Sequence, residues 1–204
     1  MLMSKNEIEK YRSNNMKIIT FLLVFLLGTN LYALQEDKIL STMQEKVDFA
    51  TKTLMQKDKK IQEKAKQIFS EIEGVFDMPL MGRLSLGKYW NTLSKEQQNL
   101  FLSLFEEFMK NSYIDQLELY NNEKITIKEL EKIKENRIYL HSQIQGEKEV
   151  FKIIYKFHKN PQNNWLIYDV DIIGASIIKT YKAQFEDIMA NNSFDYLIEK
   201  LKNR

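Results

Sequence analysis

The sequence contains no cysteine, only two histidines and two prolines, and one long apolar run. Without cysteine the chain has no disulfide, no thiol nucleophile and no cysteine-linked lipid anchor, so an exported form must be held together by packing. His141 and His158 alone do not supply the ligand set of a typical zinc site. No glycine-rich phosphate loop or nucleophile elbow is present either. The common catalytic centres are therefore poorly represented.

The charges nearly cancel, with 30 basic and 28 acidic residues over 204 positions. Four of the basic and two of the acidic residues fall within residues 1–33, which leaves 26 of each sign in the remainder. Binding to nucleic acid phosphates requires a basic excess. The balance argues against a nucleic acid partner.

The apolar run occupies residues 18–27, follows Lys17 and precedes a polar segment that ends at Ala33. A basic start, a short apolar centre and a small residue at the end are the three parts of a secretory signal peptide. Spanning a bilayer takes roughly 20 apolar residues, twice what this run offers. We therefore expect residues 1–33 to be a cleaved signal peptide with an extended polar N-terminus, which an early start codon would also explain. A buried helix or an uncleaved anchor is the alternative.

The remaining chain, residues 34–204, is expected to form a single domain of the α+β class. Apolar residues recur every three or four positions over 39–54 and 61–76, which predicts two helices. Asp77 is placed to cap a short helix that has Pro79 in its first turn. Ser94 and Gln97 form a capping box that opens a long helix reaching Tyr120.

Alternating apolar and polar residues over 125–127, 137–144, 150–158 and 165–172 predict about four antiparallel strands. In the last of these, strict alternation puts Leu166, Tyr168, Val170 and Ile172 on one face. A break at Gly174 separates this strand from a helix that starts at Ile177, and a short helix follows at the C-terminus. Helices rich in Phe and Met are available to cover the apolar face of the sheet.

Candidate catalytic residues are few. Asp169 and Asp171 share the polar face of a strand, and His141 lies on a polar strand face, where a solvated side chain is the ordinary interpretation. The Phe and Met residues can form an ordinary core, but methionine also suits a cavity for flexible chains. A sixteen-carbon tail withdrawn from water is worth roughly 12 kcal/mol, so a soluble lipid carrier needs a deep cavity.

Two segments resemble one known family. The first comprises Phe76-Asp77-Met78 and residues 81–90, followed by Ser94, Gln97, Phe101, Phe105 and Tyr113; the second comprises residues 165–170, 174–178 and 181–185. Both are similar to the signatures of the MlaC-like phospholipid-binding proteins, also known as the toluene-tolerance auxiliary family. With the expected signal peptide and helix order, the similarity covers nearly all of residues 34–204.

The resemblance implies N-terminal helices, a curved four-stranded antiparallel sheet and C-terminal helices that enclose an apolar cavity. It implies a periplasmic carrier without cofactor, metal or catalytic activity. The carrier would move glycerophospholipid between an outer-membrane lipoprotein complex and an inner-membrane ABC transporter with MCE domains, and so maintain outer-membrane lipid asymmetry.

The expected lipid pocket consists of apolar positions on faces that converge in this arrangement. They are Met78, Met81, Leu84, Phe105, Phe108, Met109, Phe151, Ile153, Tyr155, Tyr168, Val170 and Ile177. Arg83 has two interpretations: it binds a headgroup phosphate, or it forms a structural ion pair with Asp77 or Asp169. Tyr181 and Gln184 are expected to be structural.

Two other functions stay open at this point. An exported cone-shaped enzyme or small-ligand module would use His141, Tyr139 and Asp169 in its cavity. A chaperone for the apolar segments of exported lipoproteins is a weaker alternative. A cavity faced by Phe151, Ile153 and Tyr155 would suit acyl chains, whereas one faced by His141, Lys152 and Asp169 would suit polar chemistry.

Overall fold

The structure is a computed structural model that describes residues 34–118, 120, 123–146 and 149–203. The expected signal peptide at 1–33 lies outside these residues. The helical elements before the sheet are η1 (Glu36–Lys38), α2 (Ile39–Leu54), α3 (Ile61–Ile72), η2 (Glu73–Val75), α4 (Met78–Leu86), η3 (Gly87–Thr92) and α5 (Lys95–Glu118). Helices α6 (Ile177–Asn191) and α7 (Phe194–Lys202) follow the sheet. Among the described residues no helix is both long enough and apolar enough to cross a membrane.

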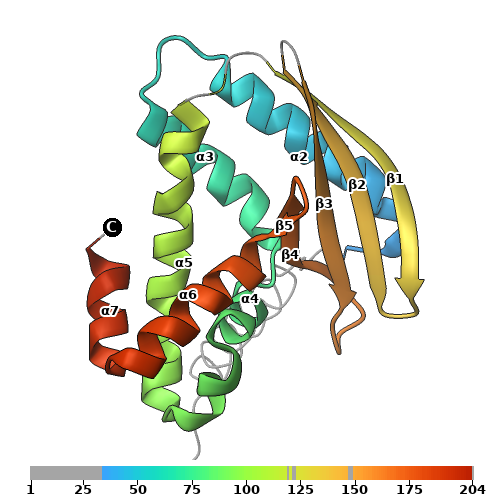
Figure 1. The fold of residues 1–204 in the computed structure, drawn as a ribbon. Helices are drawn as coiled ribbons and strands as arrows, with labels where there is room; N and C mark the ends of the chain where they lie inside the picture. Colours follow the sequence, from blue (N-terminus) through green and yellow to red (C-terminus); the bar gives the residue numbers. More distant parts are fainter. Residues whose placement is uncertain (1–33, 119, 121–122, 147–148, 204) are drawn as a thin grey trace, which may run out of the picture. The chain divides into compact units, whose positions relative to one another are not determined.

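The sheet contains β1 (Lys124–Lys134), β2 (Arg137–Gln145), β3 (Val150–Lys159), β4 (Trp165–Ile172) and β5 (Ala175–Ser176) in sequence order, with antiparallel neighbours throughout. The α+β class is confirmed, with a two-residue fifth strand added to the four expected. Figure 1 shows the long strands β1 to β3 bending alongside α2. One face of this sheet is apolar and packs on α2 through Ile39 and Met43.

A β-bulge in β4 corrects one part of the predicted strand pattern. Lys156 pairs with Asp169 but the next residue, Phe157, pairs with Ile167, so Tyr168 is the extra residue. Val170 therefore shares the apolar face with Ile167, and Tyr168 lies on the opposite face. Strict alternation predicted that Tyr168 and Val170 share one face of the sheet. That prediction is wrong, because the extra residue shifts the alternation between these two positions.

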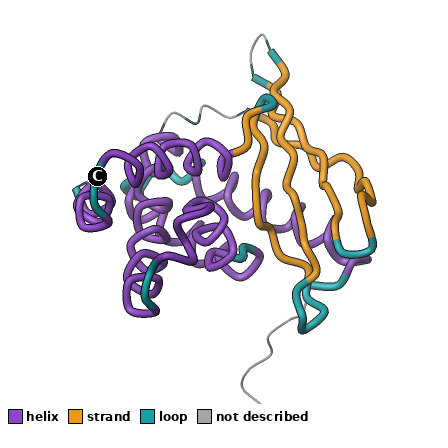
Figure 2. Tube along the Cα trace, turned by 60° about the horizontal axis from the view of Figure 1, so that its bottom comes forward, coloured by secondary structure: helices purple, strands orange, loops and turns teal. Residues whose placement is uncertain are grey.

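The apolar side chains form two hydrophobic cores. The helical core is made by α4, α5, α6 and α7 around Phe101, Phe105 and Phe185. The sheet core is made by α2 and the apolar sheet face around Phe157 and Trp165. Figure 2 shows most helices gathered to one side of the strands, with α2 at the sheet. Phe76 and Ile177 are the described side chains that pack against both cores, so they mark the seam between them.

Local capping fixes the helices next to this seam. Asp77 accepts a hydrogen bond from the backbone N–H of Leu80 at 2.9 Å, and its own N–H donates to the carbonyl of Ile167 in β4 at 2.8 Å. The start of α4 is thus attached to the sheet edge. The capping box of α5 is confirmed, because the Gln97 N–H donates to Ser94 Oγ and the Ser94 N–H donates to Gln97 Oε1.

Candidate functional site

An apolar cavity of about 270 Å³ lies along the seam between the two cores. Phe76 and Ile177, the residues that pack against both cores, are part of its wall. Helices α3, α4, α5 and α6, the η2 turn and strand β4 all contribute. The complete lining is Ile68, Phe69, Ile72, Glu73, Phe76, Met78, Met81, Met109, Lys110, Tyr113, Leu117, Val170 and Ile177.

Helix α5 contributes both to the helical core and to the wall of this cavity. Phe101 and Phe105 point into the core, where both rings contact Phe185. Leu117 lines the cavity, and Met109 and Tyr113 both line it and pack in the helical core. The apolar band of this helix is wide because it serves two surfaces, and the flexible methionine side chains make the cavity wall adaptable in shape.

Two charged residues complete the lining through their apolar atoms, and their side chains are partly exposed to solvent. Lys110 Nζ is 3.3 Å from Glu73 Oε2 and 2.8 Å from Glu106 Oε1. The side chains of Glu73 and Lys110 retain 53% and 34% of their exposure, so this part of the cavity wall is open to water. The hydrogen bond to Glu106 raises the pKa of Lys110, and the ammonium is charged at neutral pH. We refer to Glu73, Lys110 and Glu106 as the charged rim.

Tyr113 is the third lining residue that carries a polar group, although the cavity surface itself is apolar throughout. Burial raises the pKa of its hydroxyl to about 12, with a smaller contribution from Tyr181, so the side chain is neutral at physiological pH. Tyr113 and Ile177 also line a neighbouring hollow of about 340 Å³, together with Ile172, Tyr181 and Gln184. These two residues therefore form the partition between the two spaces.

The structure brings together five of the twelve residues predicted for the pocket: Met78, Met81, Met109, Val170 and Ile177. Phe105 and Phe108 instead fill the helical core, where both rings contact Tyr181. Ile153 and Tyr155 pack in the sheet core. Phe151 pairs with Ile144 next to the hairpin between β2 and β3. Leu84 is 37% exposed on α4.

Tyr168 and Arg83 lie elsewhere than expected. Tyr168 is on the outer sheet face, where its ring lies 4.9 Å from the Arg137 guanidinium carbon. Arg83 is exposed and has no ion-pair partner among the described residues. Its two expected partners pair with other residues: Asp77 with His158 at 2.7 Å and Asp169 with Lys156 at 2.9 Å. The structural ion pair proposed for Arg83 is therefore wrong.

Asp169 has a structural environment rather than a catalytic one. Its carboxylate is buried and accepts hydrogen bonds from Lys156 Nζ, from Ser176 Oγ at 2.7 Å and from the Ile178 N–H at 3.2 Å. Burial lowers the pKa of Lys156, but the hydrogen bond and charge of Asp169, assisted by Asp171, outweigh it and raise the pKa. Asp169 thus attaches β4 to the first turn of α6, the two elements that supply Val170 and Ile177 to the cavity.

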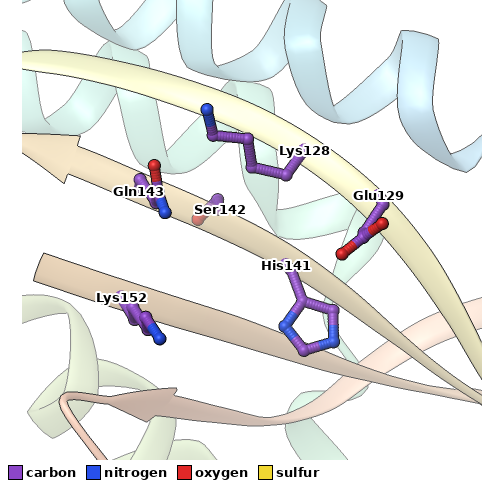
Figure 3. A pocket seen from close by; sticks show the side chains of 6 residues that line it. All are labelled: Lys128, Glu129, His141, Ser142, Gln143 and Lys152. Carbon is purple, nitrogen blue, oxygen red and sulfur yellow. The ribbon is translucent and has the colours of Figure 1, made fainter.

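A polar hollow of about 530 Å³ on the outer sheet face includes His141 and Lys152 (Figure 3). His141 Nε2 is 2.9 Å from Glu131 Oε2, and both side chains are partly exposed. Ser142 donates its hydroxyl to the carbonyl of Ile153 at 3.4 Å rather than to His141. Asp169 is not part of this hollow. Within the described ranges, no group of three or more His, Asp or Glu side chains is placed to hold a metal ion.

Comparison with known proteins settles the family. The family model for the MlaC protein matches residues 41–203. The chain belongs to the MlaC family. A curated MlaC relative is the intermembrane phospholipid transport system binding protein MlaC of Haemophilus influenzae, which is 25% identical over 193 residues, covering 91% of this chain and 90% of the relative.

A solved structure has the same fold as this MlaC-family chain. It is the phospholipid-binding protein from Ralstonia solanacearum in complex with a phospholipid, with a TM-score of 0.69 and 23% sequence identity. The match covers 80% of this chain and 94% of that one. The predicted family and fold class are therefore both confirmed.

Sequence reasoning missed several wall residues of the cavity. Ile68, Phe69 and Ile72 of α3 had been assigned to an ordinary apolar stripe. Large apolar side chains occupy more of the surface of α5 than one helix face can bury. This feature of the sequence could have indicated that Tyr113 and Leu117 line a second surface. Nothing in the sequence indicated that Glu73 and Lys110 line the cavity, because charged residues are common on helix surfaces.

Proposed function

We propose that this protein is a periplasmic carrier of glycerophospholipid. The observation that carries the proposal is the apolar cavity between the two cores of an MlaC-family chain. The name of the Haemophilus influenzae relative and the phospholipid in the Ralstonia solanacearum structure support the same ligand class. The acyl tails enter the cavity, and the headgroup stays at the charged rim.

The size of the cavity defines what loading requires. If a methylene occupies about as much space as a water molecule, about 30 Å³, then 270 Å³ holds about nine methylenes. Two tails of sixteen carbons need more than three times that room. The carrier therefore opens along the seam as lipid enters, using the adaptable side chains of Met78, Met81 and Met109.

The N-terminal segment and the expected partners complete the proposal. Residues 1–33 direct export and are removed in the periplasm. The carrier exchanges lipid with an outer-membrane lipoprotein complex and with an inner-membrane ABC transporter bearing MCE domains, and so maintains outer-membrane lipid asymmetry. The family resemblance supports these partners. The carrier itself performs no chemical reaction, and the transporter supplies the energy.

Lipid content tests the carrier function directly. The chain is expressed with its own N-terminal segment in a Gram-negative host, recovered from the periplasm without detergent, and examined by native mass spectrometry followed by lipid extraction. A near-stoichiometric mass excess that extracts as glycerophospholipid is expected. A folded protein that is empty and takes up no lipid from vesicles would contradict the proposal.

A pair of variants locates the bound lipid. Val170 lines the cavity, so Val170→Glu places a carboxylate among the acyl chains and is expected to abolish lipid retention. Phe151→Glu introduces the same group on a side chain outside the cavity lining, and its lipid content is expected to match that of the unmodified chain. Far-ultraviolet circular dichroism checks that both variants fold. Equal lipid loss in the two variants would show that the cavity is not the lipid site.

A further inference from the structure

We infer that the charged rim selects zwitterionic headgroups, those carrying an ammonium beside the phosphate, over purely anionic ones. The inference rests on the proposed function and adds to it a preference among phospholipids. It concerns Glu73, Lys110 and Glu106, of which Glu73 and Lys110 are the charged side chains in the cavity lining.

The position of the rim places it where a headgroup would lie. The cavity surface is apolar throughout, since Glu73, Lys110 and Tyr113 contribute only apolar atoms to it, so a lipid buries its tails there. The phosphate must then lie where the wall reaches water, which is where Glu73 and Lys110 retain their exposure.

The charge pattern of the rim matches a zwitterion. Two carboxylates and one ammonium leave the rim with a net charge of −1, in the order negative, positive, negative. A phosphate that replaces Glu73 as the partner of Lys110 leaves the Glu73 carboxylate free to pair with a headgroup ammonium. An anionic headgroup such as phosphoglycerol offers no cation, so Glu73 would be left beside a second negative charge.

The geometry favours this exchange of partners. The contact from Lys110 to Glu73, at 3.3 Å, is the longer of its two ion pairs and joins η2 to α5 across the cavity wall. The contact to Glu106, at 2.8 Å, is made within α5 and does not need to break. The weaker pair thus lies at the point where the wall must open, and the ammonium stays charged throughout.

Competition between two headgroups tests the inference. The periplasmic protein is incubated with vesicles that contain equal amounts of phosphatidylethanolamine and phosphatidylglycerol with identical tails, and the bound lipids are counted by native mass spectrometry. A preference of about two- to fivefold for phosphatidylethanolamine is expected, the range of one partly exposed ion pair. Glu73→Gln brings the ratio close to one, and Glu73→Lys inverts it, because the net charge of the rim becomes +1.

Glu71→Lys is the matched control, since it makes the same change in total charge two residues away. Glu71 pairs with Lys46 at 2.7 Å, between α3 and α2, and does not line the cavity. Its headgroup ratio is expected to equal that of the unmodified chain. A ratio of one in the unmodified chain, or an equal shift in Glu71→Lys, would overturn the headgroup inference alone. The absence of lipid from every form would overturn the carrier proposal and this inference with it.

Discussion

The strongest quantitative prediction concerns the length of the acyl chain. The cavity of about 270 Å³ holds about nine methylenes at about 30 Å³ each. Each methylene moved from water into an apolar space gains about 0.8 kcal/mol, a factor of about four in affinity. A ligand whose chain fills the existing cavity therefore gains about 7 kcal/mol from burial before the protein has to open.

A series of lysophosphatidylethanolamines measures this effect while the headgroup stays constant. Chains of six to sixteen carbons are titrated against a bound fluorescent fatty acid, with all concentrations below those at which the lipids form micelles. The dissociation constant is expected to fall by about fourfold per carbon up to about nine carbons. Beyond that length the slope becomes shallower, because each added carbon must also separate the two cores.

Two results would refute this reasoning. Affinity that does not depend on chain length would show that the tail is not buried. A full fourfold gain per carbon up to sixteen carbons would show that the empty protein already contains a much larger cavity. Val170→Glu serves as the control, since a carboxylate in the wall is expected to abolish binding of the fluorescent fatty acid and of every lysolipid in the series.

Three further predictions concern the residues that hold the cavity walls. Asp169→Asn breaks a buried ion pair and is expected to lower the free energy of unfolding by about 3–5 kcal/mol, measured by urea denaturation. Asp171→Asn removes a more exposed partner 3.6 Å from the same ammonium and should have a smaller effect; an equal loss would contradict the role given to Asp169. Burial opposes ionisation of Asp77, but hydrogen bonds from His158 and Leu80 and the charge of His158 outweigh it and lower its pKa. The stability that this carboxylate contributes is therefore present above its unfolded pKa, near 3.8, and is lost as the pH falls below that value. In Asp77→Asn the free energy of unfolding, measured below pH 4, should therefore fall less steeply with decreasing pH than in the unmodified chain.

Much of the fold follows from local patterns in the sequence. The capping box at Ser94 and the cap at Asp77 were predicted because their hydrogen bonds depend on residues within one helical turn. The alternation of apolar and polar residues in β2 and β3 was likewise sufficient to predict which residues share a face, since each residue there pairs with one partner. The β4 bulge at Tyr168 was not predictable in this way, because an extra residue depends on the register with the neighbouring strand.

The site was only partly predictable for a related reason. Met78, Met109 and Val170 were expected at the cavity, and they line it. Phe105 was expected there too, but a hydrophobic side chain looks the same in the sequence whether it faces a solid core or an empty space. The distinction depends on how two cores meet, which is a property of tertiary packing. The contribution of Glu73 and Lys110 depends on the same long-range packing.

In the proposed carrier, the seam marked by Phe76 and Ile177 would make the cargo part of the interior of the protein. A lipid between the two cores supplies apolar contacts to both, so it stabilises the folded state by mass action, as a ligand that binds the native form. Delivery of the lipid removes those contacts from a chain that has no disulfide to compensate. The empty carrier is thus expected to be the more easily unfolded and more readily proteolysed form.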